Sequence, residues 1–168
     1  VGNSLYGLFV EDNKLAGEQQ DVASQYKDVQ DANGYTKQFV DADNSLKTGD
    51  VFAKIYIPRL GDDWVRLIGE GIVWEPVLNK IGVGHYPQTQ LPGQVGNFAV
   101  AAHRGGFGGS FRNIHRITTG DHVYVQTNAG WFDYEYRQTK IVLPKEVGVI
   151  KPIPEGLDTA VAGGKYMT

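Results

Sequence analysis

The stretch Gly96-Asn97-Phe98-Ala99-Val100-Ala101-Ala102-His103-Arg104-Gly105-Gly106 decides how the rest of this chain is interpreted. Large and small side chains alternate along its first part, and this period of two predicts one buried strand over residues 97–102. The strand ends at His103, and the two glycines after Arg104 let the backbone turn sharply. An imidazole at a strand end suits acid–base chemistry, because its ordinary pKa lies near physiological pH. A lone histidine in such a place is also common as a structural residue, so other features must decide.

Composition predicts a single globular unit of ordinary charge. The chain has 168 residues, of which 41% are hydrophobic, enough to bury a core without covalent staples. A formal net charge of −3 gives no reason to expect nucleic acid or an acidic membrane surface as a partner. The chain contains no cysteine, which excludes disulfides and thiolate metal sites. It begins at Val1 and has no apolar run long enough to span a bilayer, so we expect that any signal or anchor has been removed or never existed.

The first 50 residues differ in character from the rest. Hydrophobic residues recur at helical spacing between about residues 4 and 31, which predicts one amphipathic helix, or two helices broken near Gly17. Residues 35–50 are polar and are interpreted as a linker. We therefore divide the chain into an N-terminal helical segment and linker, residues 1–50, and a β-rich domain, residues 51–168.

The β-rich domain carries many short strand patterns separated by turn signals. Strands are predicted at residues 52–57, 64–68, 72–74, 97–102, 122–127, 131–138, 141–143 and 147–150, with a short helix within 76–81 and a helical turn at 111–114. The regular spacing favours a β-barrel or a β-sandwich. Phe132, Tyr134 and Tyr136 share one face of their strand and are predicted to be core residues.

Four sequence blocks, in this order, carry a family resemblance. They are Gly82-Val83-Gly84-His85-Tyr86-Pro87, Leu91-Pro92-Gly93, the stretch ending at His103-Arg104, and Gly120-Asp121 before a strand. Together they resemble a class E sortase from about Val51 to Thr168. The resemblance implies an all-β fold, the eight-stranded β-barrel of sortases, which follows the N-terminal helix. It also implies a membrane-anchored cysteine transpeptidase at the extracellular face of the cell membrane of a Gram-positive bacterium.

The same resemblance implies the reaction and its partners. Sortases cleave a Leu-Pro-x-Thr-Gly-like sorting signal of a surface protein after the Thr and pass the acyl group to an amine of the cell wall or of a pilin. Class E members are associated with a Leu-Ala-x-Thr-Gly variant. No cofactor, metal or nucleic acid is implied, and the membrane anchor would precede the residues of this chain.

Carried over by position, His103 is the catalytic histidine. It would pair with a thiolate, protonate the leaving amine and then deprotonate the incoming amine. Tyr86 lies where the family contacts the front of the sorting signal and is assigned to substrate binding. His85, with the following loop to Gly93, is assigned to the wall of the pocket.

The resemblance also implies residues that this chain does not contain. The family's nucleophilic Cys follows a Thr-Leu-x-Thr block, and an Arg that stabilises the transition state lies on the next strand. The final residues, Lys165-Tyr166-Met167-Thr168, resemble those just upstream of that Cys. We therefore expect a truncated chain whose last strands are missing and whose nucleophile would fall about four residues past Thr168. The fragment alone is not expected to perform the reaction.

Other interpretations of single residues remain open. His103 and His85 are also compatible with structural roles, and His115 and His122 are expected to be solvated. Arg104 is a possible oxyanion donor, although adjacent strand residues point to opposite faces. Ser110 is a possible nucleophile for a Ser–His pair. A metal site built from the four histidines is not expected, because no two of them are three or four residues apart.

Two other functions remain as alternatives. One is a non-catalytic β-barrel module that binds peptides in a groove near His103 and Tyr86. The other is a peptidoglycan-crosslinking transpeptidase, whose His-Gly-x-x-x-Ser-His-Gly-Cys type of motif is not found here.

Overall fold

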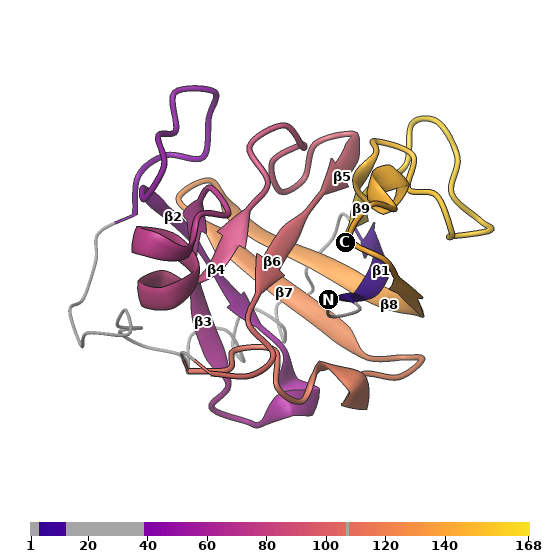
Figure 1. Ribbon diagram of the computed structural model, residues 1–168. Helices are drawn as coiled ribbons and strands as arrows, with labels where there is room; N and C mark the ends of the chain where they lie inside the picture. The colour runs from indigo at the N-terminus through magenta and orange to yellow at the C-terminus, as the bar shows by residue number, and fades with distance from the viewer. Residues whose placement is uncertain (1–3, 13–38, 107) are drawn as a thin grey trace.

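A single curled sheet forms the framework of the computed structural model, which describes residues 4–12, 39–106 and 108–168. Its strand order is β5-β9-β1-β8-β7-β2-β3-β4-β6 (Figure 1). The strands are β1 (Ser4–Asp12), β2 (Val51–Tyr56), β3 (Val65–Glu70), β4 (Gly82–His85), β5 (Gly96–Phe98), β6 (Val100–Ala102), β7 (His122–Thr127), β8 (Gly130–Val142) and β9 (Lys165–Met167). Short helices η1 (Pro58–Leu60), η2 (Trp74–Ile81), η3 (Ile114–Arg116) and η4 (Val147–Ile150) lie between them.

The two ends of the strand order belong to one extended stretch of chain. Strands β5 and β6 are separated only by Ala99, yet β5 pairs with β9 and β6 pairs with β4. Near Ala99 the stretch is bonded on both edges, because Val100 donates its backbone N–H to Thr168 and Tyr86 donates its backbone N–H to Ala99. The sheet therefore curls until its first and last strands meet, which confirms the predicted β-rich architecture. The expected eight strands are not reproduced as such, because the described residues form nine.

Most of the predicted strands are confirmed, and the exceptions have local causes. Residues 97–102 form β5 and β6 rather than one strand, and residues 141–143 overlap the end of β8. Residues 72–74 do not form a strand, because Leu78 bonds back to Val73 as η2 begins at Trp74. Residues 147–150 form the short helix η4, since Lys151 and Glu155 both donate backbone N–H groups to the carbonyl of Gly148. The periodicity of a short apolar run is not enough to distinguish a strand from a helix.

The predicted N-terminal helix is wrong over residues 4–12. These residues form β1, which pairs antiparallel with β8 from Ser4 to Asp12 and with β9 at Phe9 and Val10. Hydrogen bonds to two neighbouring strands outweigh a helical spacing of hydrophobic residues, because local propensity yields to tertiary context. The remainder of that prediction, residues 13–31, lies outside the described residues. Within the described part of the chain no helix is long and apolar enough to cross a bilayer.

The inside of the curl is filled by aromatic and β-branched side chains. Phe52, Phe98 and Tyr134 are each exposed by 1% or less and belong to one buried cluster. The predicted core stripe on β8 is confirmed, because Tyr134 and Tyr136 are buried and Phe132 packs against the same cluster. Aromatic burial of this extent is a major source of the stability of a small β domain.

The Gly120-Asp121 block is a turn that leads into β7, and Asp121 bonds to β8 and to η1. The Asp121 carboxylate accepts two hydrogen bonds from the Arg59 guanidinium, at 2.8 and 2.9 Å, and one from the backbone N–H of Thr118. The hydrogen bond from Arg59 holds the pKa of the Asp121 carboxyl below its usual range. Gly120 has φ of 90°, a conformation that favours glycine.

Candidate functional site

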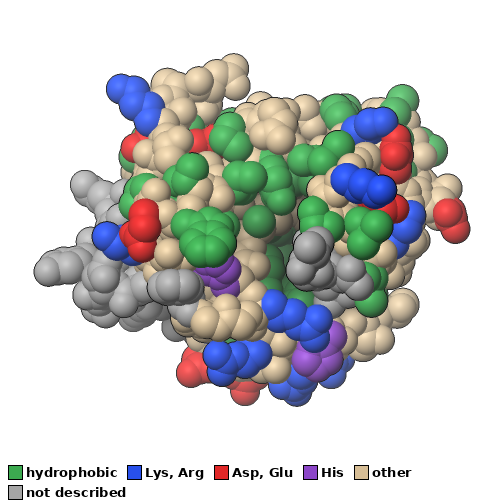
Figure 2. Space-filling view, in the orientation of Figure 1, with side chains coloured by type: hydrophobic (Ala, Val, Ile, Leu, Met, Phe, Trp, Pro, Cys, Tyr) green, Lys and Arg blue, Asp and Glu red, His purple; other side chains and the backbone are tan. Residues whose placement is uncertain are grey.

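His103 follows directly after β6, at the edge of helix η2. Its Nε2 atom lies 2.8 Å from Oδ1 of Asn79, and its ring meets the Trp74 indole edge-on with 5.9 Å between centroids. The Trp74 side chain is 66% exposed, an unusual state for so large an apolar group. Figure 2 shows this face of the molecule as hollowed, with hydrophobic side chains on both sides of the hollow and a histidine at its edge.

Tyr86 and His103 lie on one face of the β4–β6 pair, at its two ends. The antiparallel register sets Gly84 opposite Ala101, and Tyr86 donates its backbone N–H to the carbonyl of Ala99. Because side chains alternate between faces, Tyr86, Ala101 and His103 share a face. Tyr86 lies opposite Ala99, and His103 is four positions further along that strand, which corresponds to about 13 Å. The structure thus brings two of the predicted site residues to one face, a short peptide's length apart.

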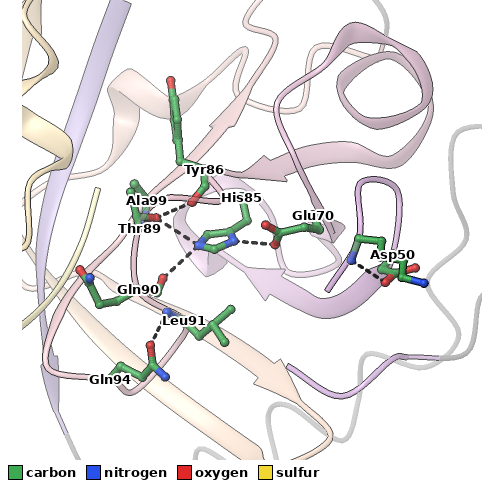
Figure 3. A network of polar contacts seen from close by, with 10 residues as sticks. Asp50, Glu70, His85, Tyr86, Thr89, Gln90, Leu91, Gln94 and Ala99 are labelled. Carbon is green, nitrogen blue, oxygen red and sulfur yellow. Dashed lines mark hydrogen bonds and ion pairs between the residues drawn. The ribbon is translucent and has the colours of Figure 1, made fainter. Parts of the chain in front are cut away.

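His85 is buried and does not line an open pocket. Its side chain is 1% exposed, and its ring lies between Phe52 and Phe98, with centroids 5.7 and 5.3 Å away. Nδ1 lies 2.7 Å from Oε2 of Glu70, as Figure 3 shows, and this carboxylate is buried as well. The expectation that His85 forms the pocket wall by direct contact is therefore corrected, because the alternation of β4 points it into the core while Tyr86 points the other way.

The hydrogen-bond partners of His85 determine which atoms of the Glu70–His85 pair carry protons. Nε2 of His85 lies 3.0 Å from the carbonyl oxygen of Gln90 and 3.1 Å from Oγ1 of Thr89. The Thr89 hydroxyl donates to the Tyr86 carbonyl and accepts from the Ala99 N–H, so both neighbours of Nε2 act as acceptors. Nε2 therefore carries a proton, and a second proton lies between Nδ1 and Glu70. The pair as a whole bears no net charge, which is the condition for burying it.

The loop after Tyr86 is held in one shape by the same network (Figure 3). Gln90 binds His85 through its carbonyl and accepts the backbone N–H of Asn97 with its side chain, at 2.8 Å. Gly93 donates its N–H to the Tyr134 hydroxyl at 3.0 Å. A Cβ at Gly93 would lie 2.2 Å from the Phe132 ring, which explains the glycine of the Leu91-Pro92-Gly93 block. The role of His85 is to position this loop.

Asn97 is a buried polar junction that was not predicted from the sequence. It is fully buried, and its side-chain amide donates to the carbonyls of Val149 and Lys151 at 3.0 and 3.1 Å. Its Oδ1 accepts the hydroxyl proton of Thr168 at 3.0 Å. Three segments distant in sequence are therefore tied together beside β5. The available signal was a polar residue within a strand of otherwise apolar or small residues, since a buried amide requires partners.

The strand β9 runs parallel to β5 in a defined register. Gly96, Asn97 and Phe98 lie opposite Lys165, Tyr166 and Met167. The register continues one residue further, because Thr168 donates its N–H to Phe98 and accepts the N–H of Val100. The end of β9 is thus directed along β6 toward His103.

The other residues considered from the sequence lie away from this arrangement or are engaged elsewhere. Arg104 contacts Nδ1 of exposed His115 at 3.2 Å, on the surface. Ser110 is 5% exposed. His122 is not simply solvated, because its Nδ1 lies 2.6 Å from the buried Asp133 carboxylate. Among the residues that the structure describes, no group of His, Cys, Asp and Glu is arranged to hold a metal ion.

Comparisons with known proteins agree on one family. A family model described as "Sortase domain" matches residues 55–168. The curated sortase SrtE1 of Streptomyces coelicolor is 35% identical over 131 residues, which cover 74% of this chain and 36% of that protein. The chain therefore spans about a third of the length of this relative.

Two solved structures resemble the fold as well. Sortase E from Streptomyces avermitilis is 40% identical with a TM-score of 0.59, and the match covers 65% of this chain and 71% of that chain. Sortase E1 from Streptomyces coelicolor, solved with a tripeptide in its active site, is 34% identical with a TM-score of 0.62, and the match covers 67% and 72%.

The Glu70–His85 pair yields a prediction about stability. Replacing Glu70 with Ala leaves a buried imidazole without its partner, so the free energy of unfolding should fall by about 3–5 kcal/mol. Urea denaturation of the 168-residue chain measures this change. Glu135→Ala is the matched control, because Glu135 pairs with Arg137 on the surface and should cost less than about 1 kcal/mol. A loss below about 1 kcal/mol for Glu70→Ala would contradict the positioning role of the pair.

Proposed function

This chain belongs to the sortase family, and the relatives named above are class E sortases. We propose that the chain supplies the catalytic histidine of a cysteine transpeptidase site. In the full-length protein, the site cleaves a sorting signal of the Leu-Pro-x-Thr-Gly or Leu-Ala-x-Thr-Gly type. It then joins the severed surface protein to an amine of the cell wall or of a pilin.

The observation that carries this proposal is the register between β9 and the β5–β6 stretch. If the strand continues past Thr168 in the same register, the fourth following residue falls opposite His103. The family resemblance expects the nucleophilic Cys at about that position. Paired residues of parallel strands are about 4.8 Å apart and face the same side of the sheet. A thiolate there would lie beside the imidazole, as thiol–histidine catalysis requires.

The proposed reaction divides the chemistry between the two groups. The thiolate attacks the Thr carbonyl carbon, and the Thr–Gly C–N bond breaks as His103 gives a proton to the departing amine. A thioester then links the Thr acyl group to the Cys. The incoming amine attacks the thioester carbonyl, His103 removes the amine's proton, and the thiolate leaves. An Arg beyond Thr168, expected from the family, would stabilise the negative oxygen.

Tyr86 is proposed to contact the front of the sorting signal. It lies at the end of the β4–β6 pair away from His103, at about 13 Å, which an extended peptide of four residues spans. Half-buried Ala101 lies between them on the same face, where it packs against the buried side of η2. His85 contributes indirectly, because it pins the loop that follows Tyr86.

The whole protein is proposed to work at the extracellular face of the cell membrane. Its partners would be surface proteins that carry a sorting signal and the amine acceptor. A membrane anchor would precede the residues of this chain, and residues 51–168 would form most of the catalytic domain after an N-terminal segment of residues 1–50. These proposals rest on the family.

The first test is the variant His103→Ala in the full-length protein. Loss of the general acid and base should lower kcat for cleavage of a sorting peptide by about 10²–10⁴-fold. A thermal melt should change little, because His103 lies at the end of a strand, near the surface. Cleavage that stays within about threefold of the wild type would refute the catalytic role. A full-length wild type that binds a sorting peptide without cleaving it would instead favour the peptide-binding module.

The second test concerns the choice between Ala and Pro at the second signal position. Pro has no backbone N–H, whereas Ala offers one that the Tyr86 hydroxyl or a bound water can accept. One net hydrogen bond is worth about 0.5–1.5 kcal/mol, or about two- to tenfold in kcat/KM. We therefore predict a preference for Leu-Ala-x-Thr-Gly over Leu-Pro-x-Thr-Gly, which Tyr86→Phe reduces and Tyr86→Ala abolishes. A wild-type preference for Pro, or a ratio unaffected by Tyr86, would show that this assignment is wrong.

A further inference from the structure

We propose that Asn79 on helix η2 is a positioning residue that sets the orientation and the tautomer of the His103 imidazole. Glu75 on the same helix holds the Asn79 amide in the required orientation. The consequence for catalysis rests on the proposed function, whereas the effect on the ring itself does not.

The orientation of the Asn79 amide follows from its two neighbours. One end of the amide lies 3.2 Å from Oε1 of Glu75, and a carboxylate oxygen accepts hydrogen bonds, so this end is the NH₂ group. The other end is therefore the carbonyl oxygen Oδ1, which lies 2.8 Å from Nε2 of His103. Because Oδ1 can only accept, Nε2 must carry the proton. The neutral ring is thus held as the Nε2–H tautomer.

The helix that carries Asn79 is fixed against the strand next to His103. Val77, Leu78 and Ile81 of η2 are buried, and Ala101 of β6 packs against the same cluster. A Cβ at Gly84 of β4 would lie 3.0 Å from Val77 and 3.1 Å from Leu78, so glycine permits the close approach of helix and strand. The packing of η2 against β4 and β6 therefore fixes the distance between Asn79 and His103. A hydrogen bond between two unpacked surface side chains would not fix it.

Two further contacts limit the motion of His103 and of Glu75. The Trp74 indole meets the His103 ring at an interplanar angle of 86° and restricts its rotation from the side. The Nζ atom of Lys80 lies 3.2 Å from Oε2 of Glu75, the oxygen that Asn79 does not use. Trp74, Glu75, Asn79 and Lys80 all belong to η2, so one short helix contributes these four side chains.

The consequence is a division of labour between the two ring nitrogens. With Nε2–H bound to Asn79, the proton that moves to and from the thiol and the amines passes through Nδ1. The imidazolium keeps the Asn79 bond, so the ring does not need to rotate between the two proton transfers. Loss of Asn79 would remove the acceptor that selects the Nε2–H tautomer, and the productive orientation of the ring would be less populated.

The ring itself can be observed in the full-length protein by NMR with labelled histidine, because imidazole nitrogen shifts distinguish the two tautomers. His103→Ala identifies the signal of this histidine. We expect the Nε2–H form in the wild type and a mixture with the Nδ1–H form in Asn79→Ala. The double variant Glu75→Gln with Asn79→Asp exchanges donor and acceptor between the two side chains, and it should restore the Nε2–H form. Asn128→Ala removes an exposed amide that bonds Phe39 and Asp41, and should leave the signal unchanged.

Kinetics of the same variants in the full-length protein test the catalytic consequence. Asn79→Ala should lower kcat by about 10- to 100-fold, because the histidine is misplaced, while KM stays within about threefold. The double variant should recover most of kcat, and Asn128→Ala should match the wild type. A role in stability alone would leave kcat unchanged in the folded fraction.

The outcomes separate this inference from the function on which it builds. A wild-type tautomer other than Nε2–H, or an unchanged signal in Asn79→Ala, overturns the positioning role. A kcat of Asn79→Ala within about twofold of an active wild type overturns its catalytic consequence. If the full-length wild type cleaves no sorting peptide, the proposed function fails, and the NMR result still decides whether Asn79 orients the ring.

Discussion

The structure depends on one constraint, the closure of the curled sheet along the stretch that contains Ala99. This stretch is bonded to β9 on one edge and to β4 on the other, although β9 and β4 are distant in sequence. Closure brings η2, the Tyr86 loop and the end of β9 around a single strand that ends at His103. A sheet left open at this point would separate the groups that the proposed chemistry requires and would expose unpaired backbone groups.

Two buried polar groups maintain the closure and shape the loops beside it. Glu70 and His85 join β3 and β4 to the loop after Tyr86, and Asn97 joins β5 to Thr168, to η4 and to Lys151 directly after it. The Glu70 carboxylate is paired with His85 through Oε2, and the Asn97 amide has partners at both its nitrogen and its oxygen, as buried polar groups require. Polar interactions inside the curled sheet thus specify loop positions, while the aromatic cluster supplies most of the hydrophobic stabilisation.

Some of these features follow from sequence patterns, and others depend on long-range contacts that patterns do not contain. The strands β2, β3, β7 and β8 were predictable because short runs rich in β-branched and aromatic residues are bounded by turn residues, although burial alternates strictly only along β7. The strand β1 was not predictable, since its conformation depends on partners at residues 133–142 and 166–167. The helix η4 was predicted as a strand for a related reason, because a carbonyl at Gly148 accepts two local hydrogen bonds.

The residues of the candidate site also divide into those that sequence patterns identify and those that only the fold reveals. His103 and Tyr86 were identified through sequence blocks, and the fold sets both on one face of the β4–β6 pair. The burial of His85 was not foreseen, because its role depends on Glu70 from a parallel strand 15 residues earlier in the chain. Asn79 had no sequence signal, since an asparagine on a short amphipathic helix is ordinary until the fold brings His103 beside it.

The central claim is that β9, continued past Thr168, carries a nucleophilic thiol to a position opposite His103. The most direct measurement is alkylation of the full-length protein with iodoacetamide, followed by mass spectrometric mapping of the modified residue and an assay of peptide cleavage. We predict modification of a Cys about four residues after Thr168, with loss of cleavage in proportion to the modified fraction. The absence of a modified residue within the ten positions after Thr168, or full cleavage activity after complete modification there, would contradict the account.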